Sequence, residues 1–234
     1  DTTRTRKLTG GIVLGSYPAP MKTGLINKEC EDAATRYMGT AIQRFFTERT
    51  EGLPFILNLV STEEGNGKSY LAERLKNYWE SLGLKVRLLT DGIDFDSGSS
   101  AFILSRSLKD LYTPRSEDIV IVEYRDLKRT NIPTPLLQEA QLNLLVASAS
   151  LGWKSTDRVL LQKLKLQTGR LPYLYLNRAA RYEVETYTGM LPPYTWMRKL
   201  IYRISQLALT EKSLSRLHGK KNTQDNLQDD DDDE

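Results

Sequence analysis

One stretch, FILNLVSTEEGNGKSYLAERL from Phe55 to Leu75, constrains the fold more than any other part of the sequence. Its first six residues are mostly apolar and β-prone, which is typical of a strand buried on both faces of a parallel sheet. A glycine-rich turn follows, and from Leu71 to Leu82 apolar residues recur at helical spacing until Gly83. A strand, a glycine-rich turn and a helix in this order predict a phosphate-binding loop in an α/β fold.

The turn carries the residue types that a phosphate-binding loop needs. Gly65 and Gly67 let backbone N–H groups approach phosphates closely, Lys68 can reach the β and γ phosphates, and Ser69 can ligate Mg²⁺. The candidate nucleotide-binding residues here are Gly65, Asn66, Gly67, Lys68, Ser69 and Tyr70. Thr62 stands where the usual pattern begins with glycine, so a chance glycine-rich connection between a strand and a helix is the alternative.

Strand-like and helix-like segments alternate along most of the chain. Further strands are expected at 85–90, 118–124, 142–150 and 171–177, with a docked strand at 11–18. Helices are expected at 29–48, 101–112, 133–141 and 155–169. This alternation predicts a mostly parallel sheet of the P-loop NTPase type, flanked by helices and joined by right-handed crossovers.

Charge and composition separate the ends of the chain from its middle. An extended lead-in, 1–28, precedes one domain at 29–210 and a basic, then acidic, tail at 211–234. Seven acids lie in 225–234, so the rest of the chain carries +10 and permits an anionic partner such as a nucleotide or a membrane surface. The acidic end repels itself, and we expect it to be disordered.

Cysteine and histidine usage narrows the chemistry. One cysteine and one histidine exclude an internal disulfide and argue against a zinc site or histidine-based catalysis, and a reducing cytosolic setting is expected. No apolar run approaches the roughly 18 residues of a membrane span, and the start without methionine suggests a piece of a longer protein. A helix at 194–209 carries apolar residues along one face, for docking on the sheet or for contact with an anionic membrane.

Acidic residues end two of the expected strands. Asp91 follows the strand at 85–90, and Glu123 closes the apolar run IVIV. The carboxyl ends of parallel strands meet at one edge of a sheet, so both acids are expected beside the phosphate loop. Phosphoryl transfer needs one acid to hold magnesium and another to orient or deprotonate the nucleophile. We therefore take Lys68, Asp91 and Glu123 as catalytic candidates, and Ser69, Asp91 and Glu123 as candidate magnesium ligands.

Three more polar residues near expected strand ends have two interpretations each. Asp94 and Asp96 follow Asp91 closely and can either add to the metal site or be solvated loop acids. Asn177 closes the last expected strand, and its amide can pair with an adenine edge or can simply belong to a turn.

With these elements in order, the chain resembles the cytoplasmic domain of bacterial tyrosine kinases (BY-kinases) that are fused to, or work with, a polysaccharide co-polymerase of the chain-length determinant family. The resemblance covers residues 25–210 and rests on STEEGNGKS, LLTDGID, IVIVEY and YLYLN at the places of the Walker A, A′ and B motifs and the last strand. It implies a P-loop sheet related to the MinD and ParA ATPases, ATP and Mg²⁺ as cofactors, and tyrosine autophosphorylation.

The resemblance also implies a cellular setting. It points to exopolysaccharide chain assembly and export at the cytoplasmic face of the bacterial inner membrane, with a membrane-spanning polysaccharide co-polymerase segment or subunit as partner. Self-association into a homo-oligomer and contact with an anionic membrane are further expectations, and no nucleic acid partner is expected.

The sequence departs from the BY-kinase pattern in its acids and its tail. Asp91 is followed by glycine and isoleucine where a second aspartate is usual, Glu123 replaces the usual aspartate, and no tyrosine follows Tyr202. Two hypotheses remain open on this basis. One is an active ATP-dependent tyrosine kinase, and the other is a nucleotide-sensing or structural pseudokinase without phosphotransfer.

Two more departures concern assembly and a third function. From Glu31, the E-x-x-R-x-x-R pattern of the family's oligomerisation helix has Ala34 and Tyr37 in place of its arginines. A ParA- or MinD-like ATPase in cellulose or polysaccharide synthesis shares the fold, but usually carries an early lysine in the loop where this chain has Thr62–Glu64. The two glutamates there place negative charge beside the γ-phosphate unless they face outward or help hold the metal.

Overall fold

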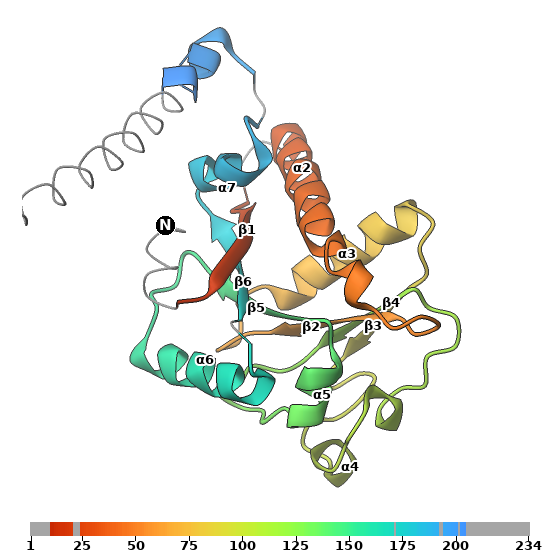
Figure 1. Ribbon diagram of the computed structural model, residues 1–234. Coiled ribbons are helices and arrows are strands. Elements are labelled where there is room, and N and C mark those ends of the chain that lie inside the picture. Colours follow the sequence, from red (N-terminus) through yellow and green to blue (C-terminus); the bar gives the residue numbers. More distant parts are fainter. Residues whose placement is uncertain (1–9, 21–23, 171, 192–193, 201, 205–234) are drawn as a thin grey trace, which may run out of the picture. The chain divides into compact units, whose positions relative to one another are not determined.

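Six parallel strands form one sheet in the computed structural model, which describes residues 10–20, 24–170, 172–191, 194–200 and 202–204. The strands lie in the order β1-β6-β5-β2-β4-β3 (Figure 1). Their bounds are β1 Ile12–Pro18, β2 Phe55–Val60, β3 Val86–Thr90, β4 Ile119–Glu123, β5 Leu142–Ser148 and β6 Tyr173–Ala179. The expected parallel α/β sheet is confirmed, and the docked strand at 11–18 is β1 at its edge.

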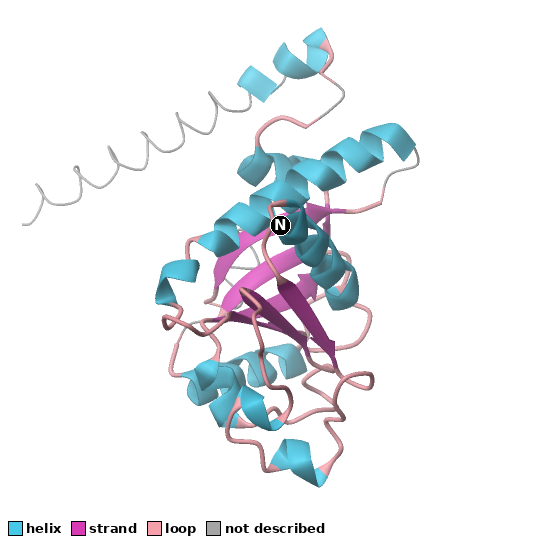
Figure 2. Ribbon diagram, turned by 90° about the vertical axis from the view of Figure 1, so that its right-hand side faces the viewer, coloured by secondary structure: helices cyan, strands magenta, loops and turns pink. Residues whose placement is uncertain are grey.

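Helices cover both faces of the sheet (Figures 1 and 2). One face carries α2 (Gly24–Gln43), α3 (Lys68–Ser81) and α7 (Arg181–Thr188). The other carries α4 (Ser100–Ile103), α5 (Thr134–Glu139) and α6 (Ser155–Thr168). Every residue of β2 is buried: Leu57 and Leu59 enter one core and Ile56 and Val60 the other. Burial on both faces explains the nearly continuous apolar run that the sequence shows there.

The helix expected at 101–112 is wrong as a single element. Only α4 and a 3₁₀ turn, η2 (Leu108–Asp110), are helical in that stretch. Ser107 is extended between them, and its hydroxyl accepts a hydrogen bond from the backbone N–H of Lys109, which starts a new turn. Serine competes with helical backbone hydrogen bonds in this way, so apolar periodicity alone overestimated the helix.

Several boundaries differ from the expected ones. Helix α2 begins at Gly24 and stops at Gln43, and a 3₁₀ turn, η1 (Phe46–Glu48), completes the expected segment. Strand β6 ends two residues later than expected, so Asn177 lies inside it. By its contacts the chain divides into two units, 1–191 and 192–234. In the second unit 196–200 and 202–204 are helical, whereas the tail at 211–234 lies outside the described residues.

None of the helices in the described part of the chain has the length and the apolar character that crossing a membrane requires.

Truncation of Leu57 tests the two-sided burial of β2. Leu57 is fully buried in the central strand, so Leu57→Ala is expected to lower the free energy of unfolding by about 2–5 kcal/mol through lost contacts and a cavity. Leu166→Ala is the matched control, because this leucine of α6 is 84% exposed. Urea unfolding of both variants measures the difference, and equal losses would contradict the assigned core.

Candidate functional site

The phosphate loop leaves the carboxyl end of β2 and runs directly into α3. Gly65 and Gly67 have φ angles of 80° and 84°, in the left-handed region that favours glycine. Gly67 is the residue before the first turn of α3, so the helix N-terminus and its free N–H groups point into the loop. The sequence prediction of a strand, a turn and a helix at this place is confirmed.

The side chain of Asn177, on β6, holds the loop by a hydrogen bond to its backbone. Its side-chain amide donates a hydrogen bond of 2.9 Å to the backbone carbonyl of Asn66. A β-carbon on Gly67 would lie 2.0 Å from that amide nitrogen, so only glycine fits. Asn177 is buried and is absent from the residues that line the loop's cavity. The sequence analysis considered that the amide of Asn177 could pair with an adenine edge or belong to a turn. In the structure this amide instead holds the backbone of the loop.

Lys68 is buried within the curve of the loop. Its ammonium donates a hydrogen bond of 2.6 Å to the hydroxyl of Ser61 at the start of the loop. Burial lowers the pKa of Lys68, and the nearby carboxylates of Glu123 and Asp126 oppose this shift. The lysine therefore lies at the bottom of the loop among acids that favour its charged form.

Ser69 and Glu123 lie in direct contact. The serine hydroxyl donates a hydrogen bond of 2.5 Å to Oε1 of Glu123, the last residue of β4. Glu123 is only 7% exposed, because its neighbours on β2 and β3 cover it. The longer side chain of glutamate thus spans the gap between the strand end and the loop hydroxyl.

Asp91 reaches the same cavity but has several partners. One carboxylate oxygen accepts from the N–H of Ser97 at 3.1 Å and the other from the N–H of Arg125 at 3.3 Å. The guanidinium of Arg125 lies 3.8 Å away.

Two further acids follow Asp91 in the same loop. Asp94 pairs with Arg87 and accepts a hydrogen bond from the backbone N–H of Thr90, and Asp96 accepts one from the N–H of Gly98. These last two acids do not line the cavity and instead order the loop that holds Asp91.

A cavity of about 490 Å³ joins these groups. Its wall consists of the loop from Glu64 to Ser69, the ends of β3 and β4, the segment after β4, and Arg178. The lining acids are Glu64, Asp91, Glu123 and Asp126, and the lining cations are Lys68, Arg125, Arg129 and Arg178. Their formal charges cancel, so any polyphosphate that enters must compete with carboxylates for cations.

The sequence reasoning missed several lining residues, among them Arg125, Asp126, Arg129 and Arg178. Asp126 is 5% exposed and lies three residues after Glu123 in the same connection, a position that could have been read as a second strand-end acid. Arg129 follows it on the same connection. Arg178 follows Asn177 with a φ of 54°, which is strained for a residue with a side chain. No sequence pattern indicated that Arg129 or Arg178 would turn toward the loop.

Tyr70 is a predicted nucleotide-binding residue that does not line the cavity. Its hydroxyl accepts a hydrogen bond of 2.9 Å from Arg74, and its ring meets Tyr17 edge to face. Arg74 also pairs with Glu31 at 2.5 Å. These contacts join α3 to α2 and leave Tyr70 beside the site rather than in it.

The donors at the loop fit a magnesium ion that comes with a nucleotide. Among the described residues, no three acidic, histidine or cysteine side chains lie close enough to hold a metal by themselves. Magnesium in nucleotide sites needs only one or two protein ligands, since phosphates and water complete its shell. Ser69 and Glu123, already 2.5 Å apart, provide such a pair, with Asp91 nearby in the cavity wall.

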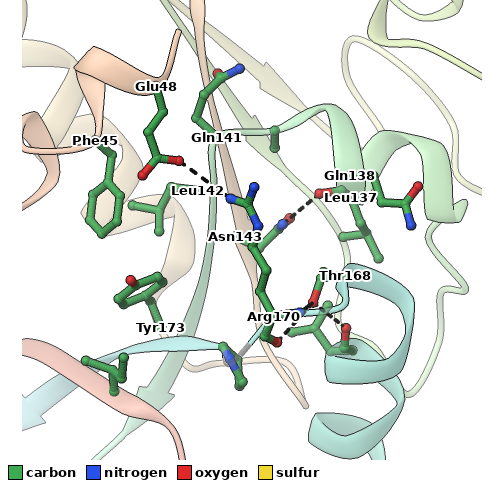
Figure 3. Close-up of a pocket in the computed structure, with 14 residues that line it drawn as sticks. Phe45, Glu48, Leu137, Gln138, Gln141, Leu142, Asn143, Thr168, Arg170 and Tyr173 are labelled. Atoms are coloured by element: carbon green, nitrogen blue, oxygen red, sulfur yellow. Dashed lines mark hydrogen bonds and ion pairs between the residues drawn. The ribbon is translucent and has the colours of Figure 1, made fainter.

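A second hollow, of about 540 Å³, lies at the amino-terminal ends of β1, β5 and β6 (Figure 3). The glycine-rich loop leaves the opposite, carboxyl end of β2. Its polar groups already serve the fold: Gln141 accepts from the N–H of Ile56 at 2.7 Å, and Asn143 donates to the carbonyl of Leu137 at 2.7 Å. Arg170 reaches across it to Glu48 at 3.5 Å. Among the described residues that line it, this hollow has no glycine-rich loop and no pair of neighbouring acids, so the loop cavity is the candidate site.

Comparisons with known proteins bear on the fold of the chain. No model of a known protein family matches the sequence, and no curated protein matches it. The kinase domain of Escherichia coli tyrosine kinase ETK superposes with a TM-score of 0.53 at 13% identity, over 80% of this chain and 95% of that chain. The BceF tyrosine kinase domain gives 0.54 at 12% identity, over 76% and 98%. The chain has the fold of bacterial tyrosine kinase domains.

A third solved structure, the chimerical protein CapA2B2, gives a TM-score of 0.51 at 14% identity, over 77% of this chain and all of that chain. At these identities the likeness establishes the fold, and the chemistry has to be argued from this chain's own residues.

Two substitutions of Arg178 test the backbone strain at this position. Arg178→Gly is expected to keep or raise the free energy of unfolding, by up to about 1 kcal/mol, because glycine tolerates the left-handed backbone at φ 54°. Arg178→Val is expected to lower it, since β-branched residues disfavour that region. Urea unfolding of both variants measures the difference, and equal stabilities would contradict the strain.

Proposed function

We propose that this chain binds ATP with Mg²⁺ in the loop cavity, as a tyrosine-kinase-like domain that acts in exopolysaccharide assembly and export. The contact between Ser69 and Glu123, beside Lys68, carries the proposal. A glycine loop alone could be a simple connection, but a loop hydroxyl paired with a buried strand-end acid is the arrangement that a nucleotide-bound metal needs.

Each group has a distinct task in binding. The N–H groups of the loop and the N-terminus of α3 would receive phosphate oxygens, and the Lys68 ammonium would neutralise them. Ser69 and Glu123 would hold the magnesium ion, directly or through water, and Asp91 would hold its water. Bound magnesium supplies neutralisation of the phosphate charge. Asp126, buried in the cavity wall, is a candidate for orienting an attacking hydroxyl.

A second function, nucleotide sensing without phosphotransfer, is favoured by two observations. The carboxylate of Asp91 is already occupied by two backbone N–H groups and by Arg125. In addition, residues 203–234 contain no tyrosine that could accept phosphate. In either version we propose a membrane-spanning polysaccharide co-polymerase segment or subunit as partner, self-association, and a place at the cytoplasmic face of the inner membrane.

Titration with ATP tests the proposed binding. Wild-type protein should bind ATP more tightly with Mg²⁺ than without it, and Lys68→Met should weaken binding about 10- to 100-fold through the loss of charge-assisted hydrogen bonds. Lys76→Met is the control, because Lys76 lies on α3 outside the cavity. Calorimetry gives the affinities. Equal binding with and without Mg²⁺ would contradict a role for Ser69 and Glu123 as ligands.

Phosphotransfer separates the two versions of the function. The protein is incubated with γ-labelled ATP and Mg²⁺, alone and with a poly-Glu-Tyr peptide. If the protein or the peptide becomes labelled, and Lys68→Met abolishes the labelling, the protein is a kinase. If the protein binds ATP but no label is transferred, it is a nucleotide sensor.

The pH dependence of ATP binding tests the state of Lys68. Burial lowers the pKa of this lysine, so it loses its proton at a lower pH than a surface lysine does. Phosphate binding needs the charged form, and the ATP affinity should therefore fall as pH rises from 7 to 10. Lys68→Arg should keep its affinity over this range, because guanidinium stays charged. The same alkaline loss in both proteins would show that another group titrates.

A further inference from the structure

The loop contains two adjacent acids, Glu63 and Glu64, at the place where a polyphosphate is expected to bind. Both are paired with cations from the segment that follows β4, residues 124–133. The Glu63 pair lies outside the cavity, whereas the Glu64 pair lines it. This difference points to a role for the Glu64 pair.

Glu63 points away from the cavity into a cluster of lysines. Its carboxylate lies 2.8 Å from the ammonium of Lys128 and 2.9 Å from that of Lys154. Hydrogen bonds from these two lysines lower the pKa of Glu63. Neither Glu63 nor its lysines line the cavity. This group fixes the outer side of the loop and keeps one of the two acids away from a bound ligand.

Glu64 and Arg129 face the cavity and lie 2.7 Å apart. Their side chains are 73% and 63% exposed, so water screens the pair and little free energy is needed to separate it. The Nε of Arg129 also lies 3.7 Å from the buried carboxylate of Asp126, which keeps the guanidinium near the site. The guanidinium is therefore positioned beside the loop and can change its partner.

The charge balance of the cavity favours that change. Four acids and four cations line it, so an incoming polyphosphate meets no net positive charge. Arg125 and Arg129 each lie 3.7–3.8 Å from a nearly buried carboxylate, but the 2.7 Å contact of Arg129 is with the exposed carboxylate of Glu64. Phosphate offers arginine more charge than a carboxylate and the same bidentate geometry. Of these two arginines, Arg129 is thus the one whose close contact is more easily exchanged.

We propose that Arg129 is a phosphate-binding residue that leaves Glu64 for the polyphosphate of the bound nucleotide. The inference rests on the proposed function and adds a specific role for Glu64, which holds Arg129 before the nucleotide binds and then competes with it for the guanidinium. Of the three cations in the segment from 124 to 133, Lys128 stays on Glu63, Arg125 stays beside Asp91, and Arg129 is exchangeable.

Affinities for ATP, ADP and AMP at fixed Mg²⁺, measured by calorimetry, test the proposal. Arg129→Gln should weaken ATP binding about 10-fold or more and AMP binding little, and Arg129→Lys should restore part of the affinity. Glu64→Gln should tighten ATP binding several-fold, because the competitor and its repulsion are removed. The matched control is Lys128→Gln, which leaves Lys154 on Glu63 and should bind ATP as wild type does.

The double variant Glu64→Gln/Arg129→Gln separates phosphate contact from simple screening. If Arg129 contacts phosphate, the double variant binds ATP more weakly than Glu64→Gln alone does. The factor should be about the same as that between Arg129→Gln and wild type. If Arg129 only screens Glu64, the double variant recovers wild-type affinity and the proposal is wrong. Equal ATP affinities of Arg129→Gln and Lys128→Gln would also overturn it. Wild-type protein that binds no ATP would instead refute the proposed function itself.

Discussion

The turn from β2 into α3 is the constraint on which the site depends. Strand β2 is buried on both faces, so the chain can meet solvent only at the strand's end. There it must reverse within a few residues, and Gly67 makes this possible with a left-handed backbone at φ 84°. The amide of Asn177 fills the space behind that glycine and holds the preceding carbonyl. Two strands thus fix one loop, and Lys68 and Ser69 are positioned by it.

Electrostatic balance distinguishes this site from a simple cation pocket. Lys68 is buried among acids, Glu123 bonds Ser69, and Arg125 and Arg129 lie beside carboxylates. Such a cavity is stable without a ligand, because these charges have nearby opposite charges. It also means that ligand binding must rearrange pairs, and the weakest of them are the exposed ones. The same balance accounts for a loop that tolerates two glutamates.

Much of the fold could be predicted from the sequence, because its signals are local. Short stretches of sequence predict their own structure here: the apolar run at 55–60, the glycines at 65 and 67, and the strand that ends at Glu123. The site was predicted in part, since Lys68, Ser69, Asp91 and Glu123 do meet at one cavity. The misplaced helix at 101–112 and the position of Tyr70 show the limit: serine capping and a side chain's direction depend on neighbours that periodicity does not include.

The sequence by itself determined the parallel α/β sheet, the glycine-rich loop between β2 and α3, and the acids at the strand ends, because these follow from residue type and spacing along the chain. Only the tertiary structure decided which charges are paired. Glu63 and Glu64 are adjacent in sequence, yet one turns out to two lysines and the other toward Arg129 in the cavity. Their partners come from segments 65–91 residues away, and the packing of β2, β4 and α6 brings them together. Long-range pairing of this kind depends on distance in space, which spacing along a chain does not specify.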